Sequence, residues 1–156
     1  MPSLVLLRHA KSAYPDGTAD HDRPLSVRGD RESLVAGVEL AQRFSAVDLA
    51  LVSTALRARQ TWHAVSSEVV AGREETRDEL YLASAATLVE LVRGLSPEAD
   101  SVLVVGHNEG LEELATLLTG VPVTMKTSTF AILRSDRPWS GWQPGSATLD
   151  EVVVAR

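Results

Sequence analysis

The chain contains two kinds of hydrophobic pattern. Three short, mainly apolar runs, at residues 4–7, 48–53 and 101–106, are each followed within a few residues by charged or polar side chains. Continuous apolar runs of this length are typical of strands buried on both faces, as in a parallel sheet. Longer segments with helical spacing of apolar residues lie between them. The pattern predicts a three-layer α/β fold with a mostly parallel central sheet.

Four helices are expected between and after these strands. Ser26 is predicted to cap a helix that runs to about residue 44. Its apolar face is expected to consist of Leu34, Val38, Ala41 and Phe44. The other helices are expected at 56–69, from Ser84 to a stop before Pro97, and from Asn108 to Gly120. Residues 74–77 predict a short edge strand, and residues 129–134 and 148–154 predict a hairpin whose connecting loop Trp139 and Trp142 pack.

Size and charge narrow the class of protein. The 156 residues suit one domain, 1–156, and the net charge of −6 argues against a nucleic-acid partner. The absence of cysteine excludes disulfides, a thiolate nucleophile and cysteine-ligated zinc. No apolar run has the length of a membrane span, and no signal-like segment precedes the first run. We therefore expect a cytoplasmic protein without membrane contact, and a monomer is favoured.

Cationic side chains follow each of the three apolar runs. Arg8 and His9 come directly after the first run, Arg57 follows the second closely, and His107 follows the third. Because ligands bind at the carboxyl edge of open α/β sheets, these four side chains are expected to converge if the strands are parallel neighbours. Two arginines and two histidines around one point suit a dianionic phosphoryl group, and a histidine can attack phosphorus.

Five segments in order give a resemblance that covers essentially the whole chain. R-H-A-K-S (8–12) resembles the Arg-His-Gly signature of the histidine phosphatase superfamily, and D-R-P-L-S-V-R-G (22–29) resembles its small SixA-type phosphohistidine phosphatases. V-S-T-A-L-R-A-R-Q-T (52–61), V-V-G-H-N (104–108) and M-K-T-S-T-F (125–130) are similar to further segments of these proteins. Two departures are Ala10 for the signature glycine and Thr54 for the usual proline; only a local effect is expected from each.

The resemblance implies a phosphoglycerate mutase-like fold and a set of site residues. His9 would be the nucleophile, and Arg8, Arg57 and His107 would form the phosphate pocket. The resemblance also assigns four residues, more weakly, to the rim of this pocket: Ser12, Arg23, Asn108 and Ser128. Asp78 and Glu79 lie where larger members place a catalytic acid, although exposed loop residues are the more ordinary interpretation.

The expected reaction needs no metal and no cofactor. One nitrogen of neutral His9 would attack phosphorus, while the other donates to a fixed acceptor such as a backbone carbonyl. Arg8, Arg57 and a protonated His107 would stabilise the charge on the transferring group. Because no acid is placed firmly, a phosphohistidine in a protein is the favoured substrate, since imidazole is a better leaving group than an alkoxide.

Two other functions stay open from the sequence. A phosphatase of small phosphomonoesters belongs to the same class, whereas mutase activity would need wall-forming insertions that this short chain lacks. A non-catalytic phosphate-binding module would be expected to lack one of the four central residues. Arg59, His63 and Lys11 are expected to be solvated, and His21 lies in the loop after the first strand without an assigned role.

Overall fold

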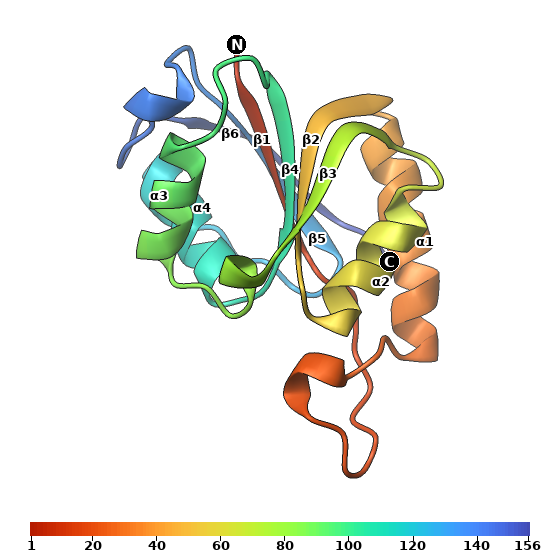
Figure 1. Ribbon diagram of the computed structural model, residues 1–156. Helices are drawn as coiled ribbons and strands as arrows, with labels where there is room; N and C mark the ends of the chain where they lie inside the picture. The colour runs from red at the N-terminus through yellow and green to blue at the C-terminus, as the bar shows by residue number, and fades with distance from the viewer.

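The computed structural model describes residues 1–156 and has a six-stranded sheet flanked by helices (Figure 1). The strands are β1 (Ser3–Arg8), β2 (Ala46–Ser53), β3 (Val70–Arg77), β4 (Ser101–Gly106), β5 (Thr129–Arg134) and β6 (Thr148–Val154). The helices are α1 (Val27–Ala41), α2 (Leu56–Val65), α3 (Ala85–Arg93) and α4 (Gly110–Thr119), with short 3-10 turns η1 (Asp20–Asp22), η2 (Asp78–Leu80) and η3 (Trp139–Gly141). The predicted α/β class is confirmed.

The sheet has the strand order β3-β2-β4-β1-β5-β6. The three predicted apolar strands β2, β4 and β1 are parallel neighbours, with Leu7 and Val52 both in register with Val105 of the central strand. The predicted edge strand starts earlier than expected, at Val70, and pairs in parallel with β2. The predicted hairpin is also present, because β5 and β6 pair antiparallel. Strand β5 also pairs antiparallel with β1, on the edge of β1 opposite β4.

Helices cover both faces of the sheet, which explains why its inner strands carry no polar alternation. In Figure 1, α1 and α2 lie on one face and α3 and α4 on the other. Leu4 and Leu6 of β1 belong to the core under α3 and α4, whereas Val5 and Leu7 belong to the core under α1 and α2. Burial of both faces therefore selects apolar residues at the four central positions of β1, 4–7.

The predicted apolar face of α1 is wrong at two of its four positions, although Ala41 and, beyond the helix end, Phe44 do pack against the core. Leu34 and Val38 are 52% and 47% exposed, whereas Ala36 and Leu40 are fully buried. Gly37 lies on the packed side, where an added Cβ would come 3.1 Å from the Cα of Val65. Small residues thus bring α1 close to α2, and contact between the backbones replaces burial of large side chains.

The remaining helices follow the sequence with shifts at their ends. Ser84 caps α3 through a hydrogen bond from the Thr87 amide, and the helix ends at Arg93, before Pro97. Helix α2 ends at Val65, four residues earlier than expected, and α4 begins at Gly110 and ends at Thr119, followed by the left-handed Gly120. No helix combines the length and the apolar character that crossing a bilayer requires.

The two tryptophans between β5 and β6 are buried, as predicted. Their rings pack together with centroids 4.9 Å apart. Trp139 Nε1 donates to the Ala99 carbonyl at 2.6 Å, and Trp142 Nε1 donates to the Arg137 carbonyl at 3.1 Å. Both indole N–H groups are therefore satisfied, and the rings stabilise the loop rather than face a ligand.

Candidate active site

The four predicted cationic positions meet at the carboxyl edge of the sheet. Arg8 ends β1 in register with Gly106, the last residue of β4, so that His9 and His107 leave adjacent strands side by side. Their ring centroids are 5.1 Å apart. Arg57, in the first turn of α2, places its Nε 3.3 Å from Nε2 of His9. Parallel pairing of β1, β4 and β2 brings these side chains together, as the sequence predicts.

The contacts of His9 define which ring nitrogen carries the proton. Its Nδ1 lies 2.7 Å from the carbonyl oxygen of Ala10, which can only accept a hydrogen bond. Its Nε2 receives the Nε–H of Arg57 and therefore offers a lone pair. Burial, followed by the nearby cations Arg57 and Arg8, lowers the pKa of His9 to about 4, although the bond to Ala10 opposes this. His9 is thus a neutral imidazole whose Nε2 carries an electron pair, which accepts a hydrogen bond from Arg57.

His107 is also neutral in this site. Its Nε2 lies 2.8 Å from the hydroxyl of Ser53, and its Nδ1 is buried without a partner. Burial, with His9 and Arg57 as further causes, lowers the pKa of His107 to about 3. A third positive charge beside two arginines is costly without an anion, whereas the protonated His107 expected from the sequence belongs to the step in which the phosphoryl group is bound.

Asp20 and Tyr81 join the site although the sequence did not single them out. Arg57 donates from Nη1 to the Asp20 carbonyl at 2.8 Å and from Nη2 to its carboxylate at 3.1 Å. Tyr81 donates its hydroxyl to the same carboxylate. The hydrogen bond from Tyr81, with Arg57 as a further cause, lowers the pKa of Asp20. The carboxylate is thus ionised and orients the guanidinium of Arg57.

Two of the four rim residues are held by contacts with neighbouring parts of the site. Arg23 stacks its guanidinium 3.9 Å above the Tyr14 ring and lies 3.3 Å from an Asp20 oxygen, while its Nη1 is buried without a partner. Asn108 donates to the Met125 carbonyl at 2.8 Å, the same oxygen that accepts from Arg8 Nη1 at 3.0 Å. Both side chains are therefore tied to the elements that carry the central four residues.

The other two rim residues support the backbone. Ser128 is fully buried, and its amide donates to the carbonyl of His9 at 3.2 Å. Its hydroxyl has no partner. Ser12 is buried where the chain makes an isolated antiparallel bridge to Leu25. These two residues thus fix the entry of the loop and the backbone of His9.

The structure separates the two carboxylates considered as acids. Glu79 forms an ion pair with Arg77 and lines a groove with Thr87 and Leu91 of α3. Asp78 accepts a hydrogen bond from the Thr54 hydroxyl at 2.9 Å. Only Asp78 is therefore connected to the end of β2 beside the pocket.

Several buried donors around His9 have no partner in the protein. They are Nε of Arg8, Nη1 of Arg23 and the hydroxyl of Ser128, joined by Nδ1 of His107 in the tautomer that carries its proton there. Unpaired buried donors are rare, and a cluster of them beside two arginines suits a multiply charged oxyanion. The chain has no group of three or more His, Cys, Asp or Glu side chains arranged to hold a metal ion.

Known proteins share this architecture. No family model matches the chain. An uncharacterized protein of Mycobacterium tuberculosis is 40% identical over 161 residues, which cover 96% of this chain and all of the relative. A solved structure described as a candidate phosphohistidine phosphatase SixA from Nakamurella multipartitia is 30% identical, with a TM-score of 0.84 over 97% of this chain and 95% of that one. The chain belongs to the histidine phosphatase superfamily, among its SixA-type members.

Two further structures agree with this membership. A candidate SixA from Agrobacterium tumefaciens is 30% identical with a TM-score of 0.79, over 98% of both chains. A protein histidine phosphatase SixA complexed with tungstate is 25% identical with a TM-score of 0.82, over 98% of this chain and 97% of that one. As a histidine phosphatase the chain is a hydrolase.

The two departures from the family pattern differ in their consequences. Ala10 is buried, its amide donates a hydrogen bond to Thr61 Oγ1 at 3.0 Å, and its carbonyl accepts one from Nδ1 of His9. The methyl group therefore leaves the signature geometry in place. Thr54 does more than the local effect expected of it, because its hydroxyl contacts both Asp78 and His21, each at 2.9 Å.

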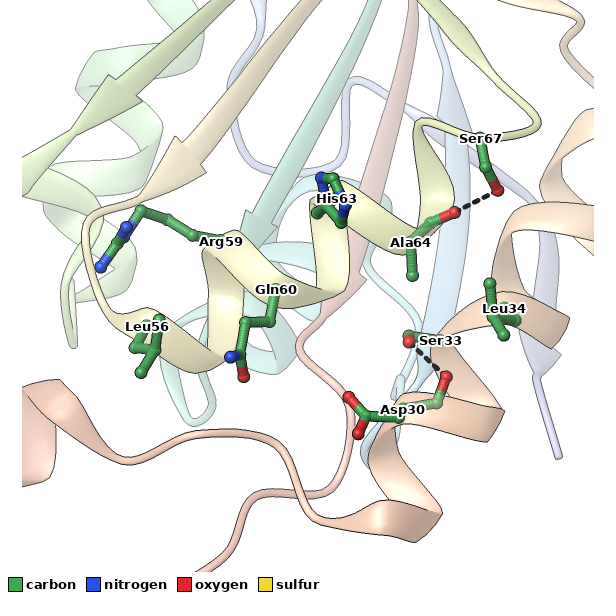
Figure 2. Close-up of a pocket in the computed structure, with 9 residues that line it drawn as sticks. All are labelled: Asp30, Ser33, Leu34, Leu56, Arg59, Gln60, His63, Ala64 and Ser67. Atoms are coloured by element: carbon green, nitrogen blue, oxygen red, sulfur yellow. Dashed lines mark hydrogen bonds between the residues drawn. The ribbon is translucent and has the colours of Figure 1, made fainter.

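The largest surface groove lies away from this pocket. It has a volume of about 610 Å³ and runs between α1 and α2 (Figure 2). Arg59 and His63 line it on the exposed side of α2, and Arg59 Nε donates to the Thr54 carbonyl at 3.0 Å. Both side chains therefore point away from His9, as predicted.

Proposed function

We propose that this histidine phosphatase removes the phosphoryl group from phosphohistidine in a protein, without a metal, through a covalent intermediate on His9. The observation that carries this proposal is the pair of contacts on the His9 ring. Nδ1–H is held by the Ala10 carbonyl at 2.7 Å, and Nε2 presents its lone pair between Arg57 and His107. A nucleophile in the required tautomer thus stands inside an anion-binding pocket.

In the first step, Nε2 of His9 attacks phosphorus in line, and the bond to the leaving group breaks. Negative charge spreads over the equatorial oxygens during transfer. Arg8 and Arg57 supply fixed positive charge, and the unpaired donors of His107 and Ser128 supply hydrogen bonds. The arriving dianion also favours protonation of His107, which the empty pocket disfavours.

In the second step, water attacks the phosphohistidine intermediate and inorganic phosphate leaves. The same arginines stabilise this transition state, because the charge on phosphorus passes through a similar distribution. Nε2 of His9 regains its lone pair when the P–N bond breaks, and the Ala10 carbonyl keeps the ring in position throughout.

The choice of substrate rests on where a proton is required. An alkyl ester expels an alkoxide, so an acid must reach the oxygen bonded to phosphorus. The carboxylate nearest the pocket, Asp20, is ionised by its contacts with Tyr81 and Arg57, and Glu79 is turned toward α3. Phosphohistidine expels neutral imidazole once its far ring nitrogen is protonated, which requires no acid inside the phosphate pocket. A P–N substrate therefore fits this pocket best.

A substrate panel tests the proposal. The panel contains a phosphohistidine peptide, p-nitrophenyl phosphate, phenyl phosphate and common phosphometabolites, each assayed with and without EDTA. We expect the highest kcat/KM for the peptide, no effect of EDTA, and an acid-labile phosphoenzyme that is absent in His9→Ala. A higher kcat/KM for a phosphometabolite would favour the small-molecule alternative, and EDTA inhibition reversed by one divalent ion would contradict metal independence.

A further inference from the structure

His21 lies at the mouth of the pocket on η1, and the mechanism above does not use it. Its side chain is 38% exposed. The ring packs edge-on against Tyr81 with centroids 4.7 Å apart, and Tyr81 packs edge-on against His107 at 5.6 Å. A continuous row of rings therefore connects His9, His107, Tyr81 and His21 from the phosphate pocket to solvent.

A hydrogen-bonded chain orients the His21 ring. The Thr54 hydroxyl donates its single proton to Asp78 Oδ1 at 2.9 Å, so that it can only accept from His21. Nε2 of His21, 2.9 Å away, must therefore carry a proton and donate it. Nδ1 is the nitrogen left for exchange, and it lies 3.7 Å from the carboxylate of Asp22. The sequence His21–Thr54–Asp78 thus fixes one tautomer and one ring position.

The other groups at the mouth are unsuited to giving up a proton. Asp20 is ionised, and Tyr81 donates its hydroxyl to that carboxylate, which raises the pKa of Tyr81. His107 is neutral and buried. His21 is therefore the one ionisable side chain of this row that is both oriented by a donor–acceptor chain and open to an incoming substrate.

We propose that His21 is the general acid that protonates the leaving group, and that Thr54 and Asp78 are positioning residues. The inference rests on the proposed phosphatase function. As His9 Nε2 forms its bond to phosphorus, the electron pair of the breaking P–N bond stays on the departing imidazole. Nδ1 of His21 gives its proton to the imidazole's far nitrogen, so that a neutral molecule leaves. For an ester, the proton goes to the bridging oxygen.

Neutral His21 is recharged in the second step. The water that attacks the phosphohistidine at His9 loses a proton, and Nδ1 of His21 takes it, which restores the imidazolium for the next turnover. Proton and charge therefore balance over the cycle without any group beyond substrate, water and this chain.

The test is leaving-group dependence in His21→Gln, with His63→Gln as the matched control on the outer face of α2. For His21→Gln, kcat/KM for phenyl phosphate is expected to fall about 100-fold, the low end for a general acid. For p-nitrophenyl phosphate, whose leaving group needs little protonation, it should stay within about threefold of wild type. Thr54→Val keeps the His21 ring but removes its hydrogen-bond partner. It should lower kcat/KM for phenyl phosphate about tenfold, with p-nitrophenyl phosphate again little affected. His63→Gln should change neither rate.

The outcomes separate this inference from the function on which it rests. Equal losses on both esters in His21→Gln, or no loss on phenyl phosphate, would overturn the role of His21 while leaving phosphatase activity established by the wild-type rates. If His21→Gln does not fold, the ratio of kcat/KM for the two esters in Thr54→Val decides whether His21 has this role. A wild-type chain that turns over no member of the panel would instead contradict the proposed function.

Discussion

The phosphate pocket and its mouth are built by different means. His9, Arg57 and His107 are almost completely buried, and all three are placed by strands of the sheet or by the first turn of a helix packed on it. At the mouth, His21 and Asp78 come from short 3-10 turns, and hydrogen bonds between exposed side chains hold them. In Figure 1 the loop that carries η1 projects beyond the edge of the sheet.

The difference teaches which part of the reaction each region can control. Transfer at phosphorus needs charges fixed before the substrate arrives, and buried strands supply that rigidity. The leaving group differs between substrates, so residues on loops can adapt to it without disturbing the sheet. Variants in the two regions are therefore expected to fail in different ways, and the following four predictions rank these failures by size.

The largest effect is expected for His9→Ala. Covalent catalysis is lost entirely, because no other side chain presents a lone pair between Arg57 and His107, and kcat should fall by about 10⁴-fold or more. A thermal melt checks that the sheet remains folded. Activity within about tenfold of wild type, equal to about 1.4 kcal/mol of barrier, would show that His9 is not the nucleophile.

Arg57→Lys is expected to lose about 10²- to 10³-fold in kcat/KM on every substrate. The guanidinium donates to Asp20 through two nitrogens and to His9 through a third, and one ammonium group cannot make these contacts together. The matched control is Arg59→Lys, two positions further along the same helix, which should stay within about twofold because Arg59 faces the outer groove. Equal losses in both variants would remove the distinction between the two arginines.

The same two regions explain how far the sequence could be interpreted. The parallel strands and the central four residues were predictable, because continuous apolar runs fix the strands and parallel strands place their following residues at one edge. The buried face of α1 was not predictable, since Gly37 permits a close contact with α2 that apolar periodicity does not reveal.

The mouth could not be predicted for a related reason. Thr54 lies 33 residues from His21 and 24 from Asp78, and none of the three belongs to a periodic pattern. Their contact depends on the path of a loop and on one 3-10 turn, which local propensity does not determine. The lowered pKa of His107 was likewise not predictable, because the cost of burial beside Arg57 depends on three-dimensional proximity.

The third prediction uses the lowered pKa of His9. Because burial and the surrounding cations lower this pKa to about 4, the neutral nucleophile persists as the pH falls, and kcat/KM should lose activity through His9 only below about pH 4. At pH 5 a histidine with an ordinary pKa near 6.5 would be about 30-fold less available. The measurement is a pH profile of kcat/KM on p-nitrophenyl phosphate, corrected for ionisation of the substrate.

Folding must be followed in the same samples. The unfolded chain binds more protons than the folded one between about pH 6.5 and the lowered pKa values of His9 and His107, so stability decreases as the pH falls through this range. Only rates measured below the melting temperature at each pH therefore test the prediction. A decrease in kcat/KM near pH 6.5, measured on folded protein and corrected for ionisation of the substrate, would show that burial in the pocket does not lower the pKa of His9.

The smallest effects are expected at the two carboxylates of η2. They compare Asp78, which contacts Thr54 at the mouth, with its neighbour Glu79, which does not. Asp78→Asn keeps a side-chain oxygen near Thr54 but removes the charge, so kcat/KM for phenyl phosphate should fall by about three- to tenfold and that for p-nitrophenyl phosphate should not change. Glu79→Gln loses only an exposed ion pair with Arg77 and should leave both rates within about twofold, because exposed pairs contribute little and this one faces α3. The double variant should retain most of its turnover of a phosphohistidine peptide, since neither carboxylate touches the phosphoryl group. A 100-fold loss of kcat/KM on an alkyl phosphate in Glu79→Gln would identify Glu79 as the general acid. The division into pocket and mouth would then have to include Glu79 among the residues that control the leaving group.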